Sequence, residues 1–278
     1  MRIVQLSDLH VRPRGDLAYG RVDPAPMLEA AVARILSLSP LPGLVLATGD
    51  LTDRGLAVEY ELLREILSRL PMRVLLLPGN HDRRDGMRGA MRALDPTIPA
   101  SGPMHRALDA GGIRLVLLDS VIDGETDGAL GAAGIAWLEG ALREGDGRPA
   151  LVAIHHAPFD VGIPGMDSIG LRDGAAMGDV IARHAEVELV ACGHHHRPMI
   201  RRWRGTTGFV APSTVHQVHL DLAPGARTRF AMEPPGFALH DWAPGRGLVT
   251  HVVPVDDGGG AFDFELDPAY PGKGSQRT

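Results

Sequence analysis

The sequence predicts an α/β protein in which sheets and helices form separate layers. Short, near-continuous apolar runs alternate with helical patterns along the first two thirds of the chain. Runs of this kind suit strands that are buried on both faces, and their alternation with helices is typical of parallel sheets. The runs are followed within three residues by Asp, Asn or His, which puts polar side chains at the strand ends where α/β sheets bind ligands.

Six strands are expected from the apolar runs. Each run is four to six residues long and rich in Leu, Ile, Val or Ala. That length favours strands, because a helix needs about 10–12 residues. The expected strands cover residues 3–6, 44–47, 74–77, 113–118, 151–154 and 187–191.

Four helices are expected between these strands. The first opens with Asp23 followed by Pro24, an N-cap residue and a proline at the first helical position. The second places Leu62, Leu63 and Ile66 at the spacing of one helix face. Together with two weaker patterns, the expected helices cover residues 24–38, 56–70, 132–142 and 174–184.

The pattern changes after about residue 197. A strand leading into a turn is expected first, then two strands that could pair, then one more; these cover residues 201–206, 215–220, 227–232 and 248–255. The polar tail 271–278 is expected to fray. We therefore expect residues 1–200 to form the core, and residues 201–278 to complete the sheet and add a cap or an oligomer contact.

Composition excludes several classes of protein. The 278 residues are 44% hydrophobic and 22% charged, which is ordinary for a globular protein, and the net charge of -6 argues against a general nucleic-acid-binding surface. A single cysteine, Cys192, rules out an intramolecular disulfide. The N-terminus lacks the pattern of a signal peptide, and no apolar run approaches the roughly 20 residues of a membrane helix. We expect a cytoplasmic protein that binds neither membranes nor nucleic acid polymers.

Histidines gather at the predicted strand ends. Seven of the 13 histidines fall in four short segments, namely His10, His81, His155, His156, His194, His195 and His196. In the first segment, Asp8 and His10 are two residues apart, so on extended chain both side chains can reach one ion. By itself this pair is equally compatible with an ordinary surface Asp and His.

Two glycine-led segments follow the next two strands. In Gly49-Asp50-Leu51-Thr52-Asp53 the glycine allows a tight turn, and one carboxylate can bridge two cations. In Gly79-Asn80-His81-Asp82, Asn80 offers a carbonyl oxygen, His81 could donate a proton or stabilise charge, and Asp82 could orient His81. Each segment alone could also be a plain turn.

The last two segments are rich in imidazole, which suits transition metals. His194 and His196 have the same two-residue spacing as Asp8 and His10, so they can address one cluster, and the side chain of His195 is expected to point away. One member of the pair at residues 155–156 is also expected to point away.

In this order, the motifs D-x-H, G-D-x-x-D, G-N-H-D, a histidine pair and G-H-x-H resemble those of the calcineurin-like metallophosphoesterases, over residues 8–196. The resemblance implies a four-layer αββα sandwich with residues 1–200 as the catalytic core and a C-terminal β-containing cap or oligomerisation segment. Within that superfamily the chain is most similar to the class III cyclic nucleotide phosphodiesterases of the bacterial glycerophosphodiesterase type. Residues 14–20 and 214–218 look like the early and late loops of that type.

The resemblance also implies the roles of individual residues. Asp8, His10 and His196 would hold one metal ion, Asn80, His155 and His194 a second, and Asp50 would bridge them. His81 would contact the phosphate or protonate the leaving group beside Asp82, and His81, His216 and Tyr19 would contact the substrate.

The implied activity is hydrolysis of small phosphodiesters, either glycerophosphodiesters or cyclic nucleotides, by a metal-activated hydroxide. The two ions would be Fe, Mn, Zn or Co, and the protein would be a dimer or larger homo-oligomer. The loop 157–172 is expected to set specificity, with Asp167 either touching a substrate hydroxyl or serving as a plain surface carboxylate.

Three other functions remain open from the sequence. A phosphomonoesterase or protein phosphatase is suggested by Arg54 in Gly49–Gly55, since a similar arginine grips phosphate in such enzymes. A nuclease is a second alternative, and the only local cluster of basic residues with an aromatic that could bind a nucleic acid is at residues 201–204. A non-catalytic metal-binding protein would keep the fold without turnover.

Overall fold

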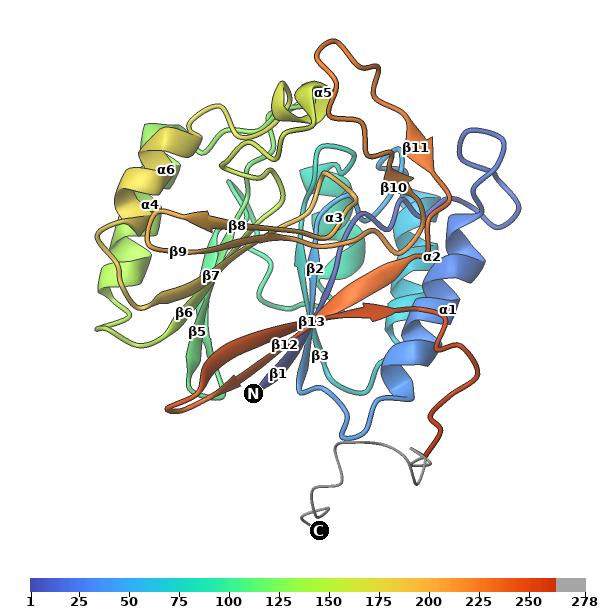
Figure 1. Ribbon diagram of the computed structural model, residues 1–278, viewed down its shortest axis with the longest axis horizontal. Helices are drawn as coiled ribbons and strands as arrows, with labels where there is room; N and C mark the ends of the chain where they lie inside the picture. The colour runs from blue at the N-terminus through green and yellow to red at the C-terminus, as the bar shows by residue number, and fades with distance from the viewer. Residues whose placement is uncertain (264–278) are drawn as a thin grey trace, which may run out of the picture.

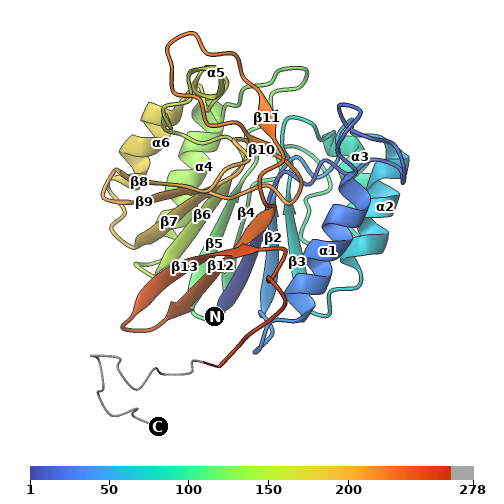
Figure 2. The same ribbon diagram turned by 45° about the vertical axis from the view of Figure 1, so that its right-hand side comes forward.

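The computed structural model describes residues 1–263 and has four layers. Two sheets pack face to face in the centre, and helices cover the outer face of each sheet (Figures 1 and 2). This arrangement confirms the αββα sandwich expected from the motifs.

The first sheet has the strand order β13-β12-β1-β2-β3. Its parallel centre consists of β1 (Arg2–Leu6), β2 (Leu44–Thr48) and β3 (Arg73–Leu77). The later strands β12 (Gly236–Ala243) and β13 (Gly247–Pro254) extend it antiparallel beyond β1.

The second sheet has the order β4-β5-β6-β7-β9-β8. Its four central strands run parallel, and an antiparallel strand closes each edge. The strands are β4 (Arg106–Ala110), β5 (Ile113–Leu118), β6 (Ala150–Ile154), β7 (Val187–Cys192), β8 (Met199–Trp203) and β9 (Thr206–Val210).

The helices form the two outer layers. α1 (Pro24–Leu36), α2 (Ala57–Leu67) and α3 (Arg84–Met91) share an apolar cluster with the first sheet. α4 (Gly131–Arg143) and α6 (Gly174–Ile181) do the same on the second sheet, and the short α5 (Pro164–Asp167) lies in a loop above it (Figure 2).

The near-continuous apolar runs are explained by a core of three apolar layers. Along β1, Ile3 points into the layer between the sheets, while Val4 packs against the helices. Leu46 and Val45 alternate in the same way on β2. Because both faces of these strands are buried, neither face needs a polar residue.

The six strands and four helices expected from the sequence are all present, with ends shifted by a few residues. Five elements were not expected, namely α3, α5, β4, β9 and β12; of these, β4 and β12 carry charged residues, and α3 begins with Arg84 and Asp85. The strand leading into a turn that was expected over residues 201–206 is confirmed, because β8 ends at Trp203 and Arg204 and Gly205 form the turn to β9.

The region after residue 200 contributes to both sheets through β8, β9, β12 and β13. Between them, β10 (Gln217–Val218) and β11 (Phe230–Ala231) pair antiparallel as a small separate sheet, as expected. The expected frayed tail 271–278 lies outside the described residues. Within residues 1–263, no helix combines the length and apolar character needed to cross a bilayer.

One histidine of the fold gives a prediction for stability. His240 on β12 is fully buried, its Nε2 donates to Gln5 Oε1 at 3.0 Å, and its Nδ1 accepts from Thr250 Oγ1 at 2.9 Å. Burial lowers the pKa of His240 to about 3. The unfolded chain, with a histidine pKa of about 6.5, therefore takes up a proton that the folded chain excludes, and the free energy of unfolding falls as the pH drops below about 6.5.

We expect His240→Gln, which keeps an amide donor for Gln5, to make the free energy of unfolding less dependent on pH. The pH-dependent loss due to His240 between about pH 6.5 and pH 5 should be at most about 2 kcal/mol. Urea unfolding at several pH values measures it, with the exposed His251 of β13, changed to Gln, as the matched control. An unchanged pH slope in His240→Gln would mean that His240 is already protonated in the fold.

Candidate metal centre

The strand ends of both sheets meet at one buried site. The backbone N–H of Asp8, after β1, donates to the carbonyl of Gly49, after β2, at 3.0 Å. The N–H of His194, after β7 in the other sheet, donates to Asp8 Oδ1 at 2.9 Å. These bonds place the polar residues that follow five parallel strands around a common centre.

The backbone is strained where these side chains turn inward. Of the non-glycine residues 1–263, eight have a positive φ, and five of them belong to the predicted ligand set: Asp8, His10, Asp50, His194 and His196. Left-handed conformations cost of order 1–3 kcal/mol each and cluster at functional sites. The glycines are needed for close approach: a Cβ on Gly49 would collide with the ring of His155, and one on Gly79 with the carboxylate of Asp50.

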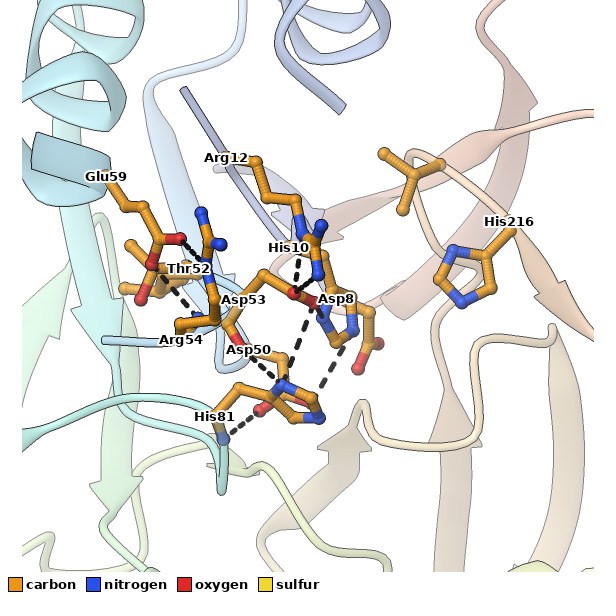
Figure 3. Close-up of polar contacts among 12 residues, drawn as sticks. Asp8, His10, Arg12, Asp50, Thr52, Asp53, Arg54, Glu59, His81 and His216 are labelled. Carbon is orange, nitrogen blue, oxygen red and sulfur yellow. Dashed lines mark hydrogen bonds and ion pairs between the residues drawn. The ribbon is translucent and has the colours of Figure 1, made fainter. Parts of the chain in front are cut away.

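A first group of donors consists of Asp8, His10, Asp50 and His196, all buried, with one ligand atom of each within 4.8 Å of the others. His10 Nε2 lies 3.0 Å from His196 Nε2 and 3.7 Å from Asp50 Oδ2, and His196 Nε2 lies 3.4 Å from Asp8 Oδ1. Figure 3 shows the side chains of Asp8, His10 and Asp50 converging.

Hydrogen bonds on the far side of each ring fix which nitrogen can bind a cation. His10 Nδ1 donates to Asp53 Oδ1 at 3.0 Å, and His196 Nδ1 donates to the carbonyl of His216 at 3.1 Å. Both acceptors are oxygens without a proton, so in the neutral rings both Nε2 atoms present lone pairs. Two lone pairs 3.0 Å apart require a proton or a cation between them.

The carboxylates around this group also favour a positive charge at its centre. Burial alone would lower the pKa of His10, but the hydrogen bond with Asp53 and the charges of Asp50 and Asp8 outweigh it and raise the pKa. Asp8 is fully buried, burial raises its pKa, and its Oδ2 has no hydrogen-bond partner within the described residues. This donor set fits a transition metal ion.

A second group lies on the other side of Asp50. His155 Nδ1 donates to the carbonyl of Thr48 at 2.8 Å, which leaves its Nε2 facing Asp50 Oδ1 at 3.4 Å and Asn80 Oδ1 at 3.3 Å. His194 Nε2 donates to the carbonyl of Ile169 at 3.0 Å, so its Nδ1 is the free nitrogen. The two carboxylate oxygens of Asp50 thus face different groups, as a bridging ligand requires.

His156 is close enough to join this second group, but its nitrogens are occupied. Its Nδ1 accepts from Ser120 Oγ at 2.8 Å, and its Nε2 donates to the carbonyl of Thr126 at 3.2 Å. His155 is therefore the member of the pair that faces the centre. The His195 ring instead lines a separate cavity of 310 Å³ below the loop 157–172.

His81 lies at the partly exposed edge of the site, whereas Asp82 is buried. His81 Nδ1 donates to the carbonyl of Asp53 at 2.7 Å, which leaves Nε2 available at the exposed edge of the site. Asp82 is buried and accepts hydrogen bonds from the backbone N–H groups of Leu51 and Gly79 and from the hydroxyl of Tyr60. Asp82 thus ties two loops together, and within the described residues it accepts no hydrogen bond from the His81 ring, which it was expected to orient.

The other residues assigned to substrate lie together on one side of the centre. The His216 ring is 4.7 Å from that of His196, and Tyr19 lies 5.5 Å from His216 and stacks on Phe230 at 5.0 Å. Sequence reasoning missed Phe230, because nothing in its neighbourhood marks it. It also gave Asp53 no role, although the second aspartate of G-D-x-x-D was a usable signal for the residue that orients His10.

Two further residues have structural partners. Asp167 accepts the N–H groups of Val161 and Gly162 at 2.7 and 2.9 Å, and so closes its own loop. Arg54 pairs with Glu59 Oε1 at 2.8 Å (Figure 3) and with Asp16 Oδ2 at 2.6 Å.

Comparisons with solved structures support the fold. A dimetal phosphatase from Danio rerio superposes with a TM-score of 0.64 at 13% identity, over 92% of this chain and 96% of that one. A purple acid phosphatase from yellow lupin gives a TM-score of 0.66 at 16% identity, over 92% of this chain and 52% of that one. At such low identity, the likeness concerns the fold alone.

Sequence relatives cover nearly the whole chain. A probable glycerophosphodiester phosphodiesterase of Arcobacter nitrofigilis is 35% identical over 95% of this chain and 97% of its own length. A probable cyclic nucleotide phosphodiesterase of Rhodopseudomonas palustris is 37% identical over 86% of this chain and 87% of its own. A cyclic AMP phosphodiesterase of Pseudomonas aeruginosa is 33% identical over 96% and 94%.

Residues 1–198 match the family described as calcineurin-like phosphoesterase. Together with relatives above 30% identity over most of its length, this match shows that the chain belongs to the calcineurin-like phosphoesterase family.

Proposed function

We propose that this protein is a dinuclear metal-dependent phosphodiesterase that hydrolyses small phosphodiesters, such as glycerophosphodiesters or cyclic nucleotides. The observation that carries the proposal is the position of Asp50, whose two oxygens face separate groups of imidazole nitrogens. The relatives named as glycerophosphodiester and cyclic nucleotide phosphodiesterases support the choice of diesters.

We assign Asp8, His10 and His196 to one ion, Asn80, His155 and His194 to the other, and Asp50 to both. The mixture of imidazole, carboxylate and amide donors suits Fe, Mn, Zn or Co. Bound there, the two ions would polarise a phosphoryl oxygen and lower the pKa of a water molecule.

The chain's own groups position and protonate the substrate. The Asp53 carbonyl fixes the proton of His81 on Nδ1, so a second proton on Nε2 can pass to the departing alcohol. Asp82 acts as a positioning residue, since it fixes the loops that carry Asp50 and His81. On the opposite side, Tyr19 and His216 would contact the other part of the diester.

A phosphomonoesterase or protein phosphatase is disfavoured by Arg54. Its guanidinium lies between two carboxylates, one of them on the fully buried Glu59, so it is not free to grip phosphate. A nuclease is disfavoured by the net charge of -6. A non-catalytic protein is disfavoured because no donor of the proposed set is missing.

Within residues 201–278, which were expected to add a cap or an oligomer contact, the segment 211–235 would form that contact. This segment carries β10 and β11 and exposes Leu220, Leu222 and Met232. Exposed apolar side chains favour association when it buries them, here with a second copy of the chain. The cytoplasmic location expected from the sequence is part of the same proposal.

The first prediction concerns metal and substrate class. The chelator-treated protein should be inactive and should regain turnover of bis(p-nitrophenyl) phosphate on reloading with Mn, Zn, Fe or Co. Turnover of p-nitrophenyl phosphate should be slower. Faster monoester hydrolysis would contradict the proposal and favour a phosphatase.

The second prediction concerns the bridge. Asp50→Ala should lose both metal, measured by elemental analysis, and diesterase activity, because neither group of histidines keeps its shared carboxylate. Asp179→Ala, on the exposed face of α6, is the control for removing a carboxylate. Full activity in a folded Asp50→Ala protein would exclude a bridged pair of ions.

The third prediction concerns His81. His81→Ala should keep its metal but lose about 10²–10⁴-fold in kcat, since that is the usual cost of removing a general acid. The loss should shrink for diesters with acidic leaving groups, which need no proton. An equal loss for every leaving group would point to charge stabilisation instead; His251→Ala is the control.

A further inference from the structure

A groove of 1090 Å³ opens beside the metal centre. Asn80 and His81 of the centre line it, and so do four arginines: Arg54, Arg83, Arg84 and Arg88. His216 lies on the other side of the centre from His81 and Arg54 (Figure 3). A diester bound at the centre would therefore send one substituent toward the aromatic side and the other, next to His81, into this groove.

Three of the four guanidinium groups are held by carboxylates. Arg54 pairs with Glu59 and Asp16, Arg84 with Asp119 and Asp123, and Arg88 with Asp85. Asp85 on the groove wall is thereby paired with one arginine, whereas Asp119 and Asp123 share the single charge of Arg84. Charge-paired arginines of this kind shape the wall but offer little attraction to a further anion.

Arg83 differs from the other three. Its side chain is exposed, and among residues 1–263 its guanidinium meets only the carbonyl of Arg54, at 3.4 Å from Nε, and no carboxylate. Its stem lies across Gly55, where a Cβ would come within 2.5 Å of Arg83 Cγ. The side chain is thus held in place on the groove wall while the outer nitrogens of its fork stay free.

The position of Arg83 relates it to the leaving group. His81 Nδ1 contacts the carbonyl of Asp53, and Arg83 Nε contacts the carbonyl of Arg54, the next residue. Both side chains therefore contact the short loop that carries Asp53 and Arg54. Both residues line the groove, so an alcohol that His81 protonates would depart along a wall that Arg83 shares.

We propose that Arg83 binds an anionic group on the leaving alcohol, and that the preferred substrates are linear phosphodiesters whose leaving alcohol carries a carboxylate or a phosphate. A free guanidinium fork matches both oxyanions by bidentate hydrogen bonds. The inference rests on the proposed phosphodiesterase function and narrows it, because a cyclic nucleotide has no separate leaving alcohol to place in the groove.

The test uses three methyl phosphodiesters that differ only in the leaving alcohol: propanol, hydroxypropanoate and hydroxypropyl phosphate. Metal-loaded wild type should have a higher kcat/KM for one or both charged diesters than for the propanol diester. Phosphorus NMR identifies the products. Arg83→Gln should lower that value about tenfold, the order expected for a charge-assisted hydrogen bond, and leave the propanol diester within about twofold. Arg83→Lys should be intermediate, because it keeps the charge but loses the fork.

Arg202→Gln is the matched control, since Arg202 is also exposed but lies on β8 in the other sheet. If Arg83→Gln changed kcat/KM equally for charged and neutral diesters, or changed neither, the inference would be overturned. Turnover of the propanol diester would still leave the phosphodiesterase proposal intact. Should no diester be hydrolysed, that proposal fails. Calorimetric binding of a phosphonate analogue of the hydroxypropanoate diester then tests Arg83 directly: weaker binding to Arg83→Gln supports its role, and equal binding excludes it.

Discussion

A shortage of positive charge at one buried point governs how the strand ends are arranged. Carboxylates and imidazole lone pairs from both sheets converge there, and the far nitrogen of each ring is already committed to an oxygen of the fold. In the part of the chain that the structure describes, no donor reaches His10 Nε2 and His196 Nε2, so only a proton or a cation can relieve the repulsion between them. The hydrogen bonds that surround the site therefore select the atoms left to face an ion, and Asp50 links the two groups.

The backbone strain at this site is stabilised by the rest of the fold. Five residues of the proposed ligand set lie in the left-handed region, and such strain persists only where surrounding structure over-determines it. Here the support consists of three apolar layers and of buried polar groups such as Asp82, which joins the loops after β2 and β3. Rigid strands buried on both faces can hold strained turns that an exposed loop could not.

The sequence predicted those features that depend on local pattern. Two-residue spacing grouped Asp8 with His10 and His194 with His196, and glycines marked the turns at residues 49 and 79. Contacts between distant segments left no such trace. The role of Asp82 depends on its hydrogen bonds with Tyr60 and Leu51. Phe230 stacks on Tyr19, which lies far away in the sequence. The sequence of β12 is too polar to predict a buried strand, and His240 can be buried there only because it pairs with Gln5 and Thr250.

The two sides of the centre differ in a way that relates this chain's own residues to specificity. On one side, Tyr19, Phe230 and His216 form an aromatic wall. On the other, paired charges line the groove, and within residues 1–263 Arg83 is the arginine of the groove that has no carboxylate partner. The central donors depend on the strand ends of both sheets and leave little freedom for change, whereas the two walls come from loops and from residues 211–235. Substrate preference can therefore change at the walls while the chemistry at Asp50 stays the same.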